Sequence, residues 1–103
     1  MKNMHKLMKQ AQQMQSKIMK LQEEMSDHRE EATVGGGVVT AVATGGGDLV
    51  ELRISPEVVQ PEEVEMLQDL VLAAANEALR KAKGALEEEM KKATGGMGLP
   101  GMM

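Results

Sequence analysis

Cysteine and long apolar runs are both missing from this chain of 103 residues. Without cysteine there is no disulfide framework and no thiolate chemistry, which suits a reducing compartment. No apolar stretch approaches the roughly 20 residues that a membrane-spanning helix needs. A chain of this length is expected to form one domain, and pairing with a second copy often completes the burial of such a small core. We therefore predict a soluble, cytoplasmic protein that does not bind membranes.

Aromatic residues are missing as well, since the chain has no Phe, Trp or Tyr. Single-stranded nucleic acids are usually held by stacking their bases on aromatic side chains, and this chain cannot build such a platform. Eleven methionines make up much of the apolar composition. Met is a flexible side chain that fills irregular gaps, and it also occurs on promiscuous binding surfaces. The simpler expectation is that Met and Leu fill the core and a contact between subunits.

A heptad pattern runs through the first 25 residues. Apolar side chains recur in alternating steps of three and four, and no Gly or Pro interrupts them, which predicts one long helix. We call these residues the apolar seam: Met4, Leu7, Ala11, Met14, Ile18, Leu21 and Met25. The seam is narrow, so it suits packing against another helix or a partner subunit. The helical pattern ends near Asp27 and His28.

Three short runs of alternating residues follow, namely EATV, VVTAVAT and DLVELRI, and two glycine triplets separate them. In the last run Val50, Leu52 and Ile54 share one face of a strand. This pattern predicts a three-stranded antiparallel β-meander. Hairpin turns that need positive φ explain both triplets, Gly35–Gly37 and Gly45–Gly47. A sheet of this size needs covering by another element.

A second long helix is predicted from Pro61 to about Lys92. Its first turn contains proline and acidic side chains, and its last turn contains lysines, as the helix dipole favours. Its apolar stripe is broad enough to lie on a sheet. The tail, TGGMGLPGMM, is rich in glycine and is expected to be flexible. The predicted fold class is therefore α+β: a long N-terminal helix, a meander and a long C-terminal helix in one domain over residues 1–93, with the tail at 94–103.

The sequence contains no recognisable catalytic or metal-binding signature. Both glycine triplets run into strands, whereas phosphate-binding glycine loops lead into a helix. The only histidines are His5 and His28. Neither has a nucleophile signature beside it, and no second histidine at helical spacing supports a metal at His28. We predict a protein that is not an enzyme and takes no metal, cofactor or small-molecule substrate.

Charge is distributed very unevenly along the chain. The formal net charge is −4, yet residues 1–22 contain five lysines and no acidic residue, so they carry +5 and the other 81 residues carry −9. None of these lysines lies in the apolar seam. A helix of 22 residues is about 33 Å long, close to one turn of B-DNA at about 34–36 Å. Its lysines can follow a phosphate backbone with little base readout, or they can simply keep the helix soluble.

Four stretches resemble, in this order, the YbaB/EbfC family of bacterial nucleoid-associated proteins: KQAQQMQSKIMKLQEEM, GGGVVTAVATGGGDLVELRISPE, PEEVEMLQDLVLAAANEALRKA and GGMGLPGMM. The resemblance covers nearly the whole chain. It implies a homodimer joined through its sheets, with helices projecting like the arms of tweezers. It also implies binding to double-stranded DNA in the nucleoid with limited sequence preference, and effects on nucleoid organisation and gene expression.

The basic residues of the first helix match a DNA-contacting role best, and three residues of the second helix are secondary candidates. In chain order the two sets are Lys2, Lys6, Lys9, Lys17 and Lys20, and then Arg80, Lys81 and Lys83. Exposed heptad helices also suit a different function. A prefoldin-like holdase, or a protein-interaction module of replication or recombination, is therefore the alternative.

Overall fold

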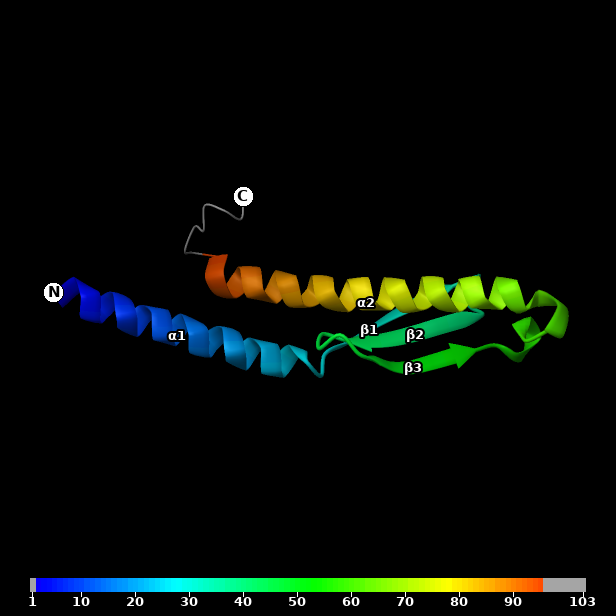
Figure 1. The fold of residues 1–103 in the computed structure, drawn as a ribbon, viewed down its shortest axis with the longest axis horizontal. Coiled ribbons are helices and arrows are strands. Elements are labelled where there is room, and N and C mark those ends of the chain that lie inside the picture. The colour runs from blue at the N-terminus through cyan, green and yellow to red at the C-terminus, as the bar shows by residue number, and fades with distance from the viewer. Residues whose placement is uncertain (1, 96–103) are drawn as a thin grey trace.

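The computed structural model describes residues 2–95, with the backbone alone at Lys2. It confirms the predicted order of elements: α1 (Lys2–Met25), β1 (Arg29–Val34), β2 (Val39–Thr44), β3 (Leu49–Ile54) and α2 (Val64–Thr94), with 3-10 turns at Pro56–Val58 and Pro61–Glu63. The molecule measures 72 × 25 × 16 Å, because α1 projects away from the sheet while α2 lies along it (Figure 1). The tail predicted to be flexible lies outside the described residues from position 96 onward.

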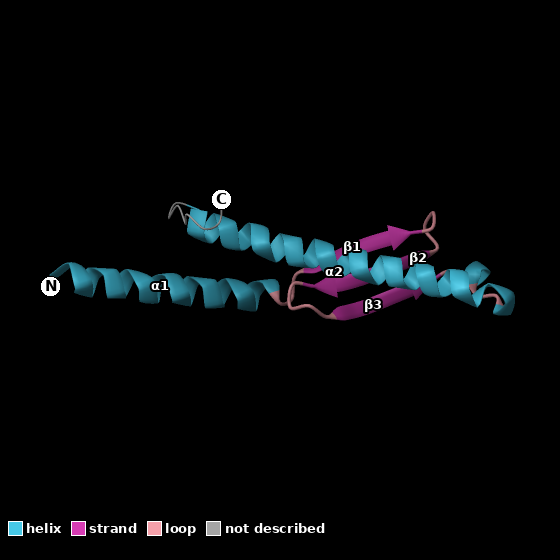
Figure 2. Cartoon of the chain, turned by 45° about the horizontal axis from the view of Figure 1, so that its top comes forward, coloured by secondary structure: helices cyan, strands magenta, loops and turns pink. Residues whose placement is uncertain are grey.

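The sheet is an antiparallel meander in the order β1-β2-β3, and α2 covers one of its faces (Figure 2). On that face of the central strand lie Val39, Ala41 and Ala43, all fully buried. They pack against a stripe of equally buried alanines on α2, namely Ala74, Ala78 and Ala82. Small side chains on both surfaces let the helix lie close to the strands. Within residues 2–95 the core is made of alanine and valine, and Leu67, Leu70 and Leu79 pack against it. The prediction that Met and Leu fill the core is therefore wrong for Met and confirmed for Leu.

Long polar side chains cover the other face of the sheet. Arg53 of β3 donates hydrogen bonds to Glu51 on its own strand and to Glu31 of β1 at 3.0 Å. Both glutamates stand opposite Val42 in the strand register. As a result Val42 is only 6% exposed, although α2 lies on the opposite face. This face is therefore closed by an ion-pair network instead of an apolar layer.

The two glycine triplets serve different purposes. All three residues of the first have positive φ, as predicted for that turn. In the second triplet only Gly47 has positive φ, so the prediction for that turn is partly wrong. Gly45 is required there for another reason: a Cβ at this position would lie 2.2 Å from the carbonyl oxygen of Met25 at the end of α1. The missing side chain lets the turn between β2 and β3 pack against the end of α1.

The free edge of the sheet is β3. α2 lies over β1 and β2, and Lys81 of α2 donates from Nζ to the backbone oxygen of Glu31 in β1 at 2.6 Å. By contrast, the apolar side chains of β3 are only partly covered: Leu49, Val50 and Leu52 are 48%, 44% and 47% exposed. One edge of the sheet is therefore tied to the helix, and the other remains apolar and accessible within the described chain.

Candidate nucleic-acid interface

The five lysines of α1 form one row along the helix. They are Lys2, Lys6, Lys9, Lys17 and Lys20, called the lysine row below. At 3.6 residues per turn they fall within an arc of about 80°, centred about 130° around the helix from the apolar seam. Gln13 lies on the same line between Lys9 and Lys17, where the row has no lysine. α1 therefore has two distinct sides, one basic and one apolar.

Every described side chain of the row is exposed to solvent, while that of Lys2 lies outside the described residues. The segment forms a helix because Lys, Gln, Met and Leu all have high helix propensity and nothing in it breaks the pattern. Lys6 and Lys9 also border a shallow surface hollow with His5, Met8 and Gln12. No acidic residue precedes Glu23, so every charged side chain of α1 before that position is basic.

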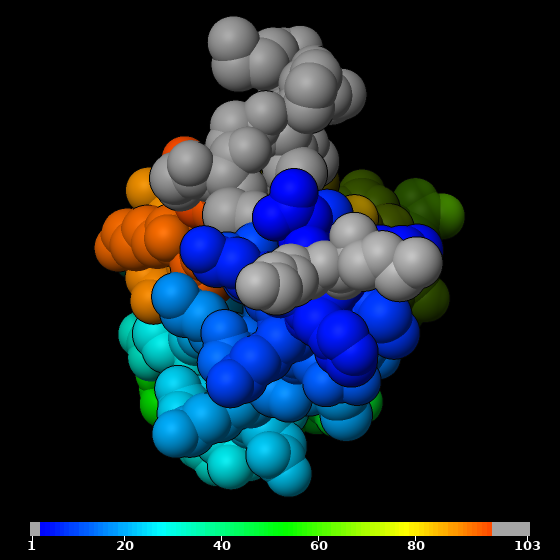
Figure 3. Space-filling view, turned by 90° about the vertical axis from the view of Figure 1, so that its left-hand side faces the viewer, coloured from blue at the N-terminus to red at the C-terminus, as the bar shows by residue number. Residues whose placement is uncertain are grey.

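The inner half of α1 meets the end of α2. A cleft between the two helices is lined by Lys17, Lys20, Leu21 and Glu24 from α1 and by Glu89, Lys92 and Ala93 from α2. Viewed from the N-terminal end of α1, the last turns of α2 lie beside it (Figure 3). Both helices therefore contribute charged side chains to one place.

Lys92 is the basic residue that α2 adds to this cleft. Its Nζ donates to a carboxylate oxygen of Glu89 at 3.1 Å, and both side chains are more than one third exposed. The hydrogen bond to Glu89, followed by the attraction of that carboxylate, raises the pKa of Lys92. Lys92 is therefore charged at neutral pH. Together with Lys17 and Lys20 it faces two glutamates, which leaves three positive and two negative charges around the cleft.

The secondary candidates lie elsewhere on α2. Arg80 donates to Glu77 at 2.6 Å, and this hydrogen bond lowers the pKa of the Glu77 carboxyl. Lys81 is held by the β1 backbone, and Lys83 is exposed six residues before Glu89, the first residue of α2 in the cleft. The structure therefore brings Lys17 and Lys20 together with Lys92, which the sequence prediction did not include. A signal for Lys92 was present in the sequence. Steps of four and three residues connect Ala78, Ala82, Ala85, Glu89 and Lys92, which places Lys92 on the side of α2 that carries the buried alanines.

Other kinds of site find no support in the described residues. Within residues 2–95 no group of three or more acidic, histidine or cysteine side chains could hold a metal ion. The ring of His28 instead pairs with the carboxylate of Glu30 at 2.6 Å, beside the turn that joins α1 to β1. None of the described helices is long and apolar enough to cross a membrane.

The fold and the lysine row define a class: a small α+β protein that carries a projecting, two-sided helix with a basic surface. The model of the YbaB/EbfC DNA-binding family matches residues 1–97, and the chain belongs to that family. A nucleoid-associated protein of Acetivibrio thermocellus is 54% identical over 97% of this chain and 89% of its own length. One of Pelotomaculum thermopropionicum is 49% identical over 97% and 95%. The crystal structure of an uncharacterized Helicobacter pylori protein is 28% identical, with a TM-score of 0.62 over 84% of this chain and 96% of that one.

Proposed function

We propose that the protein is a non-enzymatic, nucleoid-associated protein that binds double-stranded DNA through the lysine row. The row itself is the observation that carries this proposal. Membership of a DNA-binding family and the names of the relatives support it. The protein then acts in the cytoplasm, on the nucleoid, where it affects the organisation of the DNA and gene expression.

The geometry favours contact with phosphates over contact with bases. From Lys2 to Lys20 the row extends about 27 Å along the helix, which is about three quarters of one turn of duplex DNA. Lysine offers a mobile point charge, in contrast to the planar fork with which arginine reads guanine. Affinity therefore comes from neutralised phosphates and depends strongly on salt, with little preference for sequence. Glu24 and Glu89, beside the inner lysines, moderate the attraction.

A homodimer is the second part of the proposal, and the free β3 edge is the surface that supports it. The unpaired backbone N–H and C=O groups of an edge strand are a template for pairing with another chain, and exposed apolar side chains favour that pairing. Joining two copies here covers Leu49, Val50 and Leu52 and brings two lysine rows into one particle. Light scattering should therefore show a dimer for the wild type and a monomer for Leu52→Glu. Leu72→Glu, on the exposed side of α2, is the matched control and should remain dimeric. A dimeric L52E protein would refute this edge as the interface.

Binding to random-sequence DNA tests the proposal as a whole. The wild type should retard a short duplex and hold it more tightly than a single strand of equal length, because it has no aromatic side chains for stacking. A variant with Lys6, Lys9, Lys17 and Lys20 all changed to Gln should lose duplex binding at physiological salt. Unchanged retention of DNA by this variant would exclude the lysine row, and tighter binding to the single strand would contradict the duplex preference.

One observation favours the holdase as a second candidate. The outer part of the apolar seam is open, with Met4 and Leu7 68% and 62% exposed. Apolar side chains on projecting helices can hold unfolded chains. Suppressed aggregation of an unfolded client, without retardation of DNA, would favour this function. Retardation of DNA without protection of the client would exclude it.

A further inference from the structure

The apolar seam is covered along only part of its length. Met14, Ile18, Leu21 and Met25 are half-buried, and α2 reaches the inner half of α1 at Leu21. Towards the N-terminus the burial falls away: Ala11 is exposed, and Leu7 and Met4 are more than 60% exposed. The heptad pattern does not weaken at this point. The sequence therefore maintains an apolar surface beyond the region that α2 covers.

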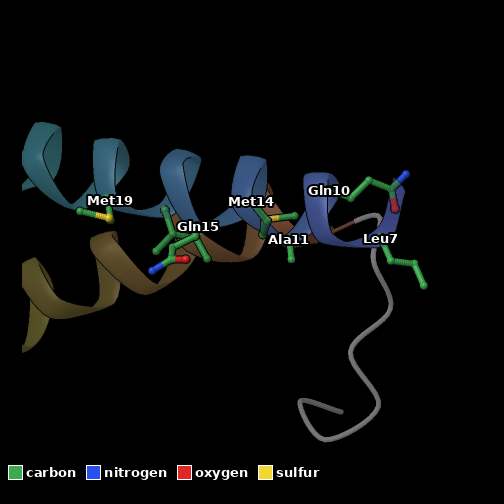
Figure 4. Close-up of a pocket in the computed structure, with 7 residues that line it drawn as sticks. Leu7, Gln10, Ala11, Met14, Gln15 and Met19 are labelled. Carbon is green, nitrogen blue, oxygen red and sulfur yellow. The ribbon is translucent and has the colours of Figure 1, made fainter. Parts of the chain in front are cut away.

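A shallow groove follows the seam from its exposed outer part to the half-buried Met14 and Ile18. Leu7, Ala11, Met14 and Ile18 line it, with Gln10 and Gln15 at its sides. Figure 4 shows Met14, Ala11 and Leu7 following one another along α1. The groove contains no charged side chain among the described residues, because the lysine row lies on another side of the helix. It therefore fits an uncharged, apolar segment.

The chain continues from the end of α2 with a segment of this kind. α2 runs back towards the N-terminal end of α1 and ends at Thr94, beside the inner half of the seam (Figure 1). The eight residues that follow, 96–103, contain Met97, Leu99, Met102 and Met103 and no charged side chain. Extended, eight residues span at most about 26–29 Å, whereas Met14 and Met4 are separated by about 15 Å along the helix axis. The segment is therefore long enough to follow the groove.

We propose that residues 96–103 of the chain dock on the outer half of its own apolar seam, between Met4 and Met14. Leu99 precedes Pro100, which disfavours a helix and favours an extended segment that can lie along the groove. Because the segment starts beside the groove, its effective concentration there is in the millimolar range, without any assembly of subunits. The segment thus takes the place that α2 leaves open, and the two-sided shape of α1 is preserved along its length.

Disulfide trapping tests this contact, and the absence of native cysteine makes the chain a clean background. Ala11→Cys combined with Leu99→Cys should form an internal disulfide under mild oxidation. Ser16→Cys with Leu99→Cys is the matched control, since position 16 lies on the other side of α1. The seam pair should close about 10-fold faster than the control pair, as followed by intact mass. Equal rates would overturn the proposal, and so would disulfides that mainly join two chains.

Hydrogen exchange gives a second test without new cysteines. Leu99→Glu places a charge in the segment, so it should release the contact and raise amide exchange in residues 4–14 several-fold. Leu72→Glu adds the same charge on the exposed side of α2 and should leave these amides unchanged. Unchanged exchange in L99E would overturn the docking. Neither test involves DNA, so both stand or fall independently of the proposed function.

Discussion

Removing lysines in pairs separates a contact with DNA from a general effect of charge. Lys6→Gln/Lys9→Gln takes two charges from the outer part of the lysine row, and Lys17→Gln/Lys20→Gln takes two from the cleft. Arg29→Gln/Lys91→Gln removes the same charge from exposed positions of β1 and α2 that are not among the DNA-contact candidates. All three variants therefore have the same net charge, and only its position differs.

The expected effect follows from the release of counterions. Each phosphate contact adds about 0.9 to the slope of log affinity against log salt concentration. A dimer of either row variant loses four lysines, so the magnitude of its slope should fall by up to about 3.6. The outer pair should have the larger effect, because Glu24 and Glu89 stand beside the inner lysines but not beside the outer ones. The control pair should keep the wild-type slope.

Fluorescence anisotropy of a labelled random duplex, titrated at several salt concentrations, measures these slopes. Far-UV circular dichroism confirms that each variant remains helical, which is expected because Gln is also a good helix former. If the control pair lowers the slope as much as the row pairs do, the charge acts through the field of the whole molecule. That result would refute a contact made by the row.

Three further substitutions test the cleft and the packing around it. Glu89→Gln removes the carboxylate that holds Lys92, so it should tighten duplex binding. The salt slope should steepen by about 0.9 for each Lys92 that engages a phosphate. Unchanged anisotropy titrations would exclude Lys92 as a DNA contact. Gly45→Ala should lower the free energy of unfolding by about 1–3 kcal/mol, because the new Cβ would clash with the end of α1. Gly46→Ala is the control and should change this free energy far less, because its Cβ would meet nothing closer than 3.5 Å. Urea titrations followed by circular dichroism measure both. Ala78→Leu should cost about 1–3 kcal/mol in the same assay, because the helix lies directly on the sheet there, and an unaffected midpoint would contradict that close packing.

The elements that the sequence predicted well are those defined by a local pattern. The seven-residue repeat of the apolar seam set the extent of α1, and alternation set the three strands. The role of Gly45 could not be predicted in the same way, because it depends on the carbonyl of Met25, which belongs to a different element. Composition also misled: eleven methionines suggested a core containing Met, but the close approach of α2 to the sheet selects alanine.

The same distinction between local patterns and contacts between elements applies to the candidate site. The lysine row is a property of one helix, so its spacing could be predicted from the sequence alone. Lys92 lies 72 positions after Lys20 and reaches the same cleft only because α2 extends past the sheet. The position of Lys81 likewise depends on tertiary structure, since its partner is the backbone of Glu31. The residue pattern within one element gives no information about such contacts between elements.

The salt dependence of wild-type binding to random duplex DNA tests the central claim most directly. If six to ten of the ten row lysines in a dimer engage phosphates, the affinity should fall by about 10³–10⁵ between 50 and 200 mM salt. The logarithm of the affinity should fall linearly with the logarithm of the salt concentration. Binding that hardly responds to salt over this range would contradict phosphate neutralisation by the lysine row.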